Sequence, residues 1–233
     1  MWDHRADRDS VGAAVFNVWF HKHVRPALMR RLASPAAAPL IRSGDAAFAI
    51  NYLEQPDTRL GPDPLRARQE LLRTALDAAT AELTTRLGPD STQWRWGRRL
   101  HALFAPPLAA AFPDDAAVPG YNVGPISKAG DNETLGRRAW RLTDFQLLSG
   151  ASARFVADTG DWDRSVANNS PGQSGDPRSR HYRDLFEDWA NDRYFPLTYS
   201  RAAVEKVAEA RLVLDPAPAL PVSGDESLGK DVR

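Results

Sequence analysis

The chain has 233 residues, 42% hydrophobic and 26% charged, a composition and length that favour a folded core over disorder. Its 30 basic residues balance its 30 acidic ones, which excludes a global field that would attract nucleic acid or an anionic membrane. The absence of cysteine excludes disulfides, thiolate zinc sites and a cysteine nucleophile.

The first ninety residues are predicted to be mainly helical. Apolar residues recur at helical spacing over 10–32, with Ser10 as the N-cap and a disturbance near Pro26. Residues 34–39 are rich in proline and end this helix. A short helix over 44–54 and a long one over 65–87 are predicted to follow.

The second half is predicted to mix loops, strands and short helices. Prolines and glycines punctuate a long irregular stretch that follows the aromatic cluster at residues 94–96. Residues 152–158 alternate as a strand does, and residues 162–167 are their predicted partner in a hairpin. We then expect an ordered loop (168–177), two helices (182–191 and 200–208), a final strand (210–214) and a disordered tail after residue 216.

Five short motifs follow one another along the chain, of which residues 151–158 are the fourth. The first, within residues 2–19, runs from Trp-Asp to Asp-Ser and into the first predicted helix. The other three comprise Trp94, Trp96, Gly97 and His101; Asp131 and Thr134; and Gly172, Gln173, Ser174, Gly175, Pro177, Ser179, His181 and Tyr182. In this order they resemble the C-terminal part of the β-subunit in the penicillin acylase (penicillin amidase) family of N-terminal-nucleophile hydrolases. The resemblance spans roughly residues 2–216, and we expect these motif residues to serve the structure.

The resemblance implies an α+β fold that forms part of the αββα sandwich of these hydrolases. A helical first half (1–89) would precede long loops, a β-hairpin, short helices and a final strand (90–216), with a tail over 217–233. Strands whose neighbours lie in other sequence would have exposed edges. We therefore expect the isolated chain to be poorly soluble or to need a partner.

The implied activity is hydrolysis of a linear amide C–N bond, which releases an acyl side chain from an amine. A β-lactam nucleus, a lipopeptide and an acyl-homoserine lactone are the substrate types of such enzymes. The family nucleophile is a serine that opens the β-subunit and uses its own α-amino group as the base. This chain begins inside what resembles a mid-subunit helix, so we expect no catalytic residue in it and no activity by itself. The alternative is a noncatalytic remnant or a binding module of the same fold.

The resemblance also sets expectations for partners, cofactors and location. The partners would be the α-subunit and the N-terminal portion of the β-subunit, with a small-molecule amide as substrate and neither nucleic acid nor membrane. Calcium in a complete enzyme would bind to ligands outside this chain, so we expect no cofactor or metal here. The polar N-terminal residues lead us to expect no signal peptide within this chain, whereas complete relatives are expected to be periplasmic or secreted.

Ser174 and His181 invite a second catalytic interpretation. With Asp184 they could form a self-contained hydrolase, but an α/β-hydrolase elbow requires glycine at position 176, where this chain has aspartate. We favour a tight loop in which Gln173 and Ser174 bond backbone groups. His181 is then expected to be a packed histidine that donates to a nearby carbonyl.

Other side chains have plain structural interpretations. His21 and His23 would point about 200° apart on a helix, too far to share a metal, and we favour a solvated helix face. Trp94, Trp96 and Tyr121 could wall an acyl pocket, but core packing is favoured. The acidic residues that match no calcium loop are Asp114, Asp115, Asp131, Glu133, Asp161 and Asp163.

Overall fold

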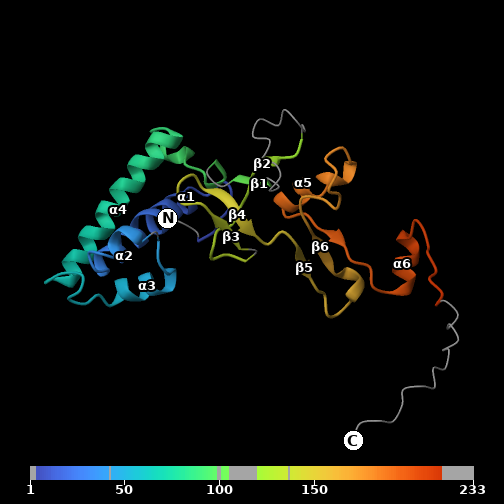
Figure 1. The fold of residues 1–233 in the computed structure, drawn as a ribbon, viewed down its shortest axis with the longest axis horizontal. Coiled ribbons are helices and arrows are strands. Elements are labelled where there is room, and N and C mark those ends of the chain that lie inside the picture. Colours follow the sequence, from blue (N-terminus) through green and yellow to red (C-terminus); the bar gives the residue numbers. More distant parts are fainter. Residues whose placement is uncertain (1–3, 42, 99–100, 105–119, 136, 217–233) are drawn as a thin grey trace, which may run out of the picture.

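The computed structural model describes residues 4–216 apart from 42, 99–100, 105–119 and 136. Helices occupy one end of an elongated molecule, and two small sheets with short helices occupy its middle and its other end (Figure 1). The predicted α+β class and its mainly helical first half are therefore confirmed. Within the described residues, no helix is both long and apolar enough to cross a bilayer.

The first helix is continuous but changes its winding. It comprises α1 (Val11–Phe16), a π-helical segment η1 (Asn17–Val24) and α2 (Arg25–Leu32), and Ser10 caps it by accepting from the Ala13 N–H. The predicted disturbance thus begins nine residues before Pro26, which lies inside α2. Proline cannot donate to the carbonyl four residues before it, and its ring crowds that carbonyl. The preceding turns are widened, and the Arg25 N–H bonds to the Phe20 carbonyl five residues back.

The other long helices begin at aspartate caps. Asp45 accepts from Phe48 N–H at the start of α3 (Ala46–Glu54), and Asp63 accepts from Arg66 N–H at the start of α4 (Pro64–Leu87). Helix α4 packs along the π-helical segment, where the Trp19 indole donates to the Leu72 carbonyl at 3.1 Å. It ends at Gly88, whose φ of +96° is accessible mainly to glycine.

Three buried clusters hold these elements together. Two join the first helix to α4, one of them through Trp94, Trp96, Trp140 and Phe145 and the other through Phe20, Leu28 and Tyr52. The third lies under α5 (Phe186–Ala190) and contains Val123, Leu147, Tyr182, Phe186 and Trp189.

The larger sheet was not predicted. Its four strands have the order β2-β1-β4-β3, with β1 and β4 parallel and the other pairs antiparallel. They are β1 (His101–Phe104), β2 (Val123–Ser127), β3 (Arg138–Trp140) and β4 (Gln146–Gly150). Each has only three to five residues, and β1 pairs with strands that lie about 20 and 45 positions along the chain, so local alternation does not reveal the sheet.

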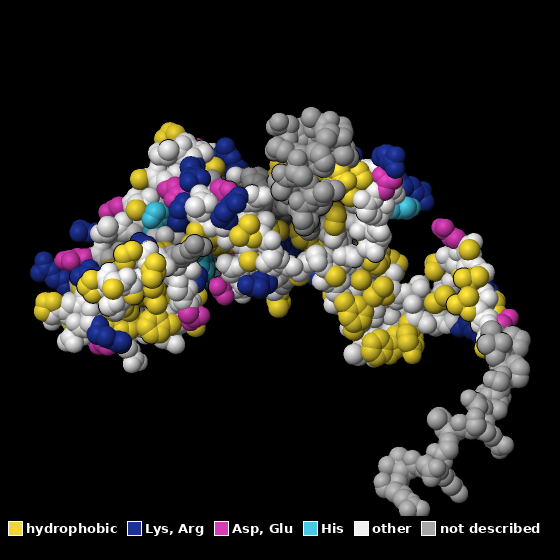
Figure 2. All heavy atoms as spheres, viewed as in Figure 1, with side chains coloured by type: hydrophobic (Ala, Val, Ile, Leu, Met, Phe, Trp, Pro, Cys, Tyr) yellow, Lys and Arg dark blue, Asp and Glu magenta, His cyan; other side chains and the backbone are white. Residues whose placement is uncertain are grey.

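The smaller sheet contains the predicted hairpin in a modified form. Strand β5 (Arg154–Val156) pairs antiparallel with β6 (Val166–Asn168), and β6 with β7 (Phe195–Pro196). The partner strand begins later than predicted, because the Asp161 carboxylate caps a 3₁₀ turn over Trp162–Arg164. Hydrophobic side chains gather on the surface over this sheet, among them the exposed Phe155, Val156 and Phe195 (Figure 2).

The remaining helices are short, and one predicted strand is wrong. Helix α5 is shorter than the predicted 182–191, whereas α6 (Arg201–Val207) agrees with its prediction and is capped by Ser200. Residues 210–214 form no strand and join no sheet among the residues that the structure describes, and Leu212, Val213 and Leu214 are exposed. The predicted tail over 217–233 lies outside the described residues, as does most of the irregular stretch after β1. In the described part of the chain, 3₁₀ segments occur at Ala38–Leu40, Ser91–Gln93, Trp96–Arg98, Trp162–Arg164 and Arg180–Tyr182.

Candidate functional site

A buried lysine joins the larger sheet to the end of α5. Lys128 directly follows β2 and is 0% exposed, and its ammonium donates to Trp189 O at 2.9 Å and Ala190 O at 3.0 Å. Its third bond, at 2.8 Å, goes to a carboxylate oxygen of Asp192. All three ammonium protons thus have an acceptor, and the charge lies where the helix presents its free carbonyls.

Two arginines from different strands approach the same carboxylate. Arg154, which begins β5, donates to the Trp189 carbonyl at 2.8 Å and pairs with Asp192. Arg138, which begins β3, has its Nη2 atom 3.7 Å from Asp192 Oδ1. We call Lys128, Arg138, Arg154 and Asp192 the cation cluster. Asp192 holds a φ of +54°, a conformation that aspartate adopts more readily than most residues.

The N-terminal segment is tied to the same place. Arg8 donates to Ala190 O at 2.6 Å and to Asn191 Oδ1 at 2.9 Å. The Ala190 carbonyl therefore receives both Arg8 and Lys128, and the Trp189 carbonyl both Lys128 and Arg154. Four segments of the chain thus meet at the end of α5.

Burial and like charges shape the protonation of the cation cluster. Burial lowers the pKa of Lys128 to about 8, and the charges of Arg138 and Arg154 act in the same direction against Asp192. Burial likewise lowers the pKa of Arg138, reinforced by Arg154. Burial alone would raise the pKa of Asp192, but hydrogen bonds from Lys128 and Arg154 lower it overall. The carboxylate is therefore the ionised anchor of the group.

A pocket opens beside the cation cluster. It has a volume of about 380 Å³, and its walls include Arg138, Arg154, Asp192 and the predicted motif residue Thr134. The motif turn closes one side: Thr134 Oγ1 accepts from Asp131 N–H at 2.9 Å, and Asp131 Oδ1 accepts from Glu133 N–H at 3.0 Å. Gly130, at a φ of +91°, packs so close that an added Cβ would lie 3.3 Å from Arg138 Cγ.

The tryptophan motif supports that turn from the core. Trp94 and Trp96 are buried in the first cluster, and the Trp96 indole donates to Gly130 O at 2.8 Å. An added Cβ at Gly97 would lie 2.8 Å from Arg8 Cβ, so the chain crosses itself closely there. Trp94 and Trp96 thus pack in the core and do not form a pocket wall. Tyr121 is half-buried, and its carbonyl accepts a hydrogen bond from the Tyr182 hydroxyl at 2.6 Å. His101 belongs to β1, and its side chain is not among the parts that the structure describes.

The glycine-rich motif forms a tight loop against its own continuation. The N–H groups of Gln173 and Ser174 both donate to His181 O, at 2.8 and 3.0 Å. An added Cβ at Gly172 would lie 2.2 Å from that carbonyl oxygen, whereas one at Gly175 would meet nothing within 4 Å. Asp176 N–H donates to Ser174 Oγ at 3.1 Å. Later in the loop, Pro177 leads to Ser179, whose hydroxyl caps the 3₁₀ turn that contains Tyr182.

The imidazole of His181 does not contact Ser174. Its Nδ1 lies 2.7 Å from Asp184 Oδ2, and its Nε2 receives Arg180 Nε at 2.9 Å. The prediction of a packed histidine that donates to a carbonyl is therefore wrong, because His181 is exposed and pairs with a carboxylate. With both ring nitrogens engaged by neighbours in the chain, His181 is part of an exposed hydrogen-bonded series from Arg180 to Asp184.

His21 corrects a second prediction. We expected a solvated helix face, but His21 is 1% exposed and stacks edge-on against Trp140 at 5.5 Å. The π-helical winding turns it into the core. Its Nδ1 receives Arg25 Nη1 at 2.6 Å, and burial, followed by the charge of Arg25, lowers its pKa to about 4. His23 pairs with Glu82 at 3.2 Å, so the two histidines do not share a ligand.

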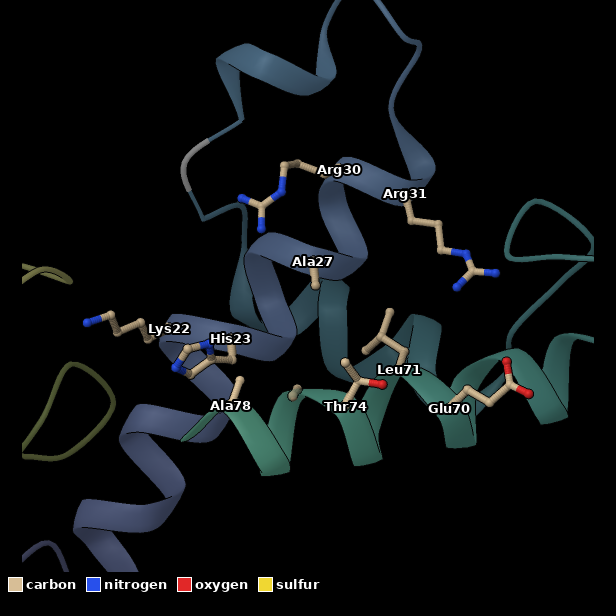
Figure 3. Close-up of a pocket in the computed structure, with 10 residues that line it drawn as sticks. Lys22, His23, Ala27, Arg30, Arg31, Glu70, Leu71, Thr74 and Ala78 are labelled. Carbon is tan, nitrogen blue, oxygen red and sulfur yellow. The ribbon is translucent and has the colours of Figure 1, made fainter. Parts of the chain in front are cut away.

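A second pocket separates the first helix from α4. It has a volume of about 430 Å³; Ala27 of α2 and Leu71 of α4 line it from opposite sides, and Arg30 and Arg31 point in different directions at its edge (Figure 3). At one end the ammonium of Lys22 binds Glu82 at 2.7 Å. No group of three or more histidine or acidic side chains among the described residues is placed to hold a metal ion.

Sequence reasoning missed the cation cluster, because its members are ordinary charged residues scattered over 64 positions. One signal was present: the chain has only four lysines among its 30 basic residues. A lysine kept in such an arginine-rich chain fits a buried position, where a compact ammonium can satisfy three acceptors that a planar guanidinium cannot.

Comparison with known proteins places these features in a family. The chain is 28% identical to the acyl-homoserine lactone acylase QuiP of Pseudomonas aeruginosa, covering 93% of this chain and 28% of that protein. It is 32% identical to the penicillin acylase 2 proenzyme of Pseudomonas sp. (strain SE83), covering 91% of this chain and 27% of the proenzyme. A solved structure, a thermostable penicillin G acylase from Alcaligenes faecalis, is similar at a TM-score of 0.41 and 16% identity, covering 89% of this chain and 39% of that one.

The chain thus spans a little over a quarter of the length of the curated relatives it matches. The family model described as penicillin amidase matches residues 1–206. This match covers most of the chain, including every motif that suggested the resemblance. The chain therefore belongs to the penicillin amidase family.

Proposed function

We propose that this chain is the C-terminal part of an acylase β-subunit that cleaves linear amide bonds, and that the serine nucleophile comes from sequence outside these 233 residues. The observation that carries the proposal is the family match over residues 1–206, with relatives several times longer. Those relatives are named for acyl-homoserine lactones and penicillin, so an acyl chain on an amine is the proposed substrate class. The reaction is acyl transfer to a serine hydroxyl, followed by hydrolysis of the ester.

In this proposal the chain contributes structure to the catalytic body. Its motifs stabilise a core and two tight turns, and any calcium would be held by ligands outside it. The α-subunit and the N-terminal β-subunit portion are the proposed partners. A self-contained centre at Ser174 receives no support, because the hydroxyl of Ser174 accepts from Asp176 N–H and the ring of His181 is engaged elsewhere.

The test compares the 233-residue chain alone with a complete acylase that contains it. Hydrolysis of penicillin G and of a series of acyl-homoserine lactones is followed by the release of free amine. We expect turnover only from the complete enzyme, and we expect Ser174→Ala in that enzyme to leave the rate within about twofold.

Two outcomes would contradict the proposal. Hydrolysis by the isolated chain that Ser174→Ala abolishes would place the nucleophile inside it. A complete, folded and processed enzyme that hydrolyses none of these amides would favour a noncatalytic binding module of the same fold.

A further inference from the structure

The pocket beside the cation cluster contains a guanidinium whose hydrogen-bonding capacity is unused. Arg138 is 3% exposed, and its Nε and Nη1 atoms have no hydrogen-bond partner among the residues that the structure describes. Its remaining nitrogen, Nη2, lies 3.7 Å from Asp192, too far for a hydrogen bond. The guanidinium lies 5.8 Å over the Trp189 ring, but that contact supplies no acceptor for Nε or Nη1. Burying charged N–H donors without acceptors is among the more expensive arrangements in a folded protein.

The neighbouring cations do not share this problem. Lys128 makes three hydrogen bonds, and Arg154 donates to Asn168, Trp189 and Asp192. Asp192 is thus the single carboxylate in the cation cluster for three positive charges. The other acid in the pocket wall, Asp7, pairs with Arg5 at 2.9 Å. The pocket lining thus has two arginines, Arg138 and Arg154, against two aspartates, and Arg138 is the one of these arginines with unused donors.

We propose that this pocket binds a carboxylate group, with Arg138 as its principal donor. The guanidinium rotates toward the pocket, so that Nε and Nη1 gain the acceptor they lack. A singly charged carboxylate is favoured over a doubly charged phosphate, because Asp7 and Asp192 line the same walls. The fully exposed side chain of Leu135, together with Ala6 and Ala129, forms an apolar rim that suits a carboxylate on a short alkyl chain.

Two sources present this chemistry. One is a free carboxylic acid, and the other is an aspartate or glutamate side chain of a polypeptide segment that covers the pocket. Both satisfy Arg138 in the same way, so the site is defined by the carboxylate and the experiment separates the sources. This inference concerns binding and does not depend on the proposed amide hydrolysis.

The first arm uses the 233-residue chain labelled with ¹⁵N-arginine. Sodium propionate is titrated against sodium chloride at equal ionic strength, and the Nε–Hε resonance of Arg138 is followed by NMR. We expect saturable movement of that resonance, and at least a tenfold loss of propionate affinity in Arg138→Gln. The matched control Arg141→Gln removes an exposed arginine that pairs with Asp144 outside the pocket, and its affinity should stay within about twofold.

The second arm uses a complete acylase that contains this chain. If a protein carboxylate already occupies the pocket, propionate moves nothing in this enzyme. The Arg138 Hε proton is then slow to exchange, and Arg138→Gln lowers the thermal midpoint more than Arg141→Gln does.

Saturation by propionate in the first arm supports a free carboxylate, and protection in the second supports a protein carboxylate. The proposal is overturned if neither propionate nor assembly changes the Arg138 resonance relative to chloride. Inorganic phosphate that binds more tightly than propionate would overturn the preference for a carboxylate. Because the resonance is read in the unsubstituted protein, an unstable Arg138→Gln variant leaves the result intact, and Arg138→Lys provides a conservative comparison.

Discussion

Gly172 offers a sharp test of the loop geometry, since a single methyl group should disrupt it. In Gly172→Ala the new Cβ would lie 2.2 Å from the His181 carbonyl oxygen and 2.7 Å from the carbonyl carbon and oxygen of Tyr182. These are backbone atoms, so no side-chain rotation relieves the contact. The backbone around Gly172 and the backbone of His181 and Tyr182 must separate by about 1 Å to reach an ordinary contact distance.

That separation weakens two hydrogen bonds, from Gln173 N–H and Ser174 N–H to the same His181 oxygen. Overpacking costs about 1–3 kcal/mol, and each lost backbone bond about 1 kcal/mol more. Alanine also restricts the unfolded chain, which offsets up to about 1 kcal/mol. The net expectation is a loss of about 3 kcal/mol.

Gly175→Ala is the matched control in the same loop, since its Cβ would meet nothing within 4 Å. We expect that variant to lie within about 1 kcal/mol of the parent. Urea unfolding followed by tryptophan fluorescence gives the global difference, and amide exchange at Gln173 and Ser174 detects a loop that opens locally. Equal stability and equal exchange in the two variants would refute the argument from close backbone approach.

Three further expectations concern charge and packing. Asp192→Asn keeps the left-handed conformation but removes the charge that balances three cations, so the free energy of unfolding in urea should fall by about 1–2 kcal/mol. Asp188→Asn, at an exposed ion pair, is the control and should change that free energy by less than about 0.5 kcal/mol. The pKa of His21 falls from 6.5 to about 4 on folding, so the unfolded chain binds the extra proton in that interval. The contribution of His21 to the free energy of unfolding is then fully present above pH 6.5 and falls by about 3 kcal/mol as the pH drops toward 4. In His21→Phe the free energy of unfolding should no longer depend on pH in this way, and an unchanged dependence would exclude His21 as its source. Trp96→Phe loses the indole hydrogen bond to Gly130 O and leaves a void, so the free energy of unfolding in urea should fall by about 2 kcal/mol. Trp162 is half-exposed, and Trp162→Phe should lower that free energy by less than about 0.5 kcal/mol.

The helices were predictable because their signals are local. Ser10 caps the first helix as expected, and α4 lies within one residue of its prediction. Strands β1 to β4 gave no such signal, since each has only three to five residues and β1 pairs with strands distant in the sequence. Residues 210–214 show the converse, because β-branched and apolar residues without a neighbouring strand form none.

The candidate site was harder to predict for two physical reasons. A π-helical segment changes the angle per residue, so the regular spacing that placed His21 on the surface did not apply. The cation cluster depends on tertiary contacts between Lys128, Arg138, Arg154 and Asp192, none of which is a motif by itself. By contrast, the family motifs are contiguous strings, and they identified the family from the residues alone.

The convergence of four segments at the end of α5 has a consequence for how the chain folds during synthesis. The first helix and α4 lie within the first ninety residues, so they can pack as soon as these leave the ribosome. The contact between Arg8 and the Ala190 carbonyl closes a loop of 182 residues and must wait for most of the chain. Until then Lys128 lacks the carbonyls and the carboxylate that bind its charge. The helical end is therefore expected to form first and the two sheets to join it in a late step, which pulse-labelled hydrogen exchange would resolve in time.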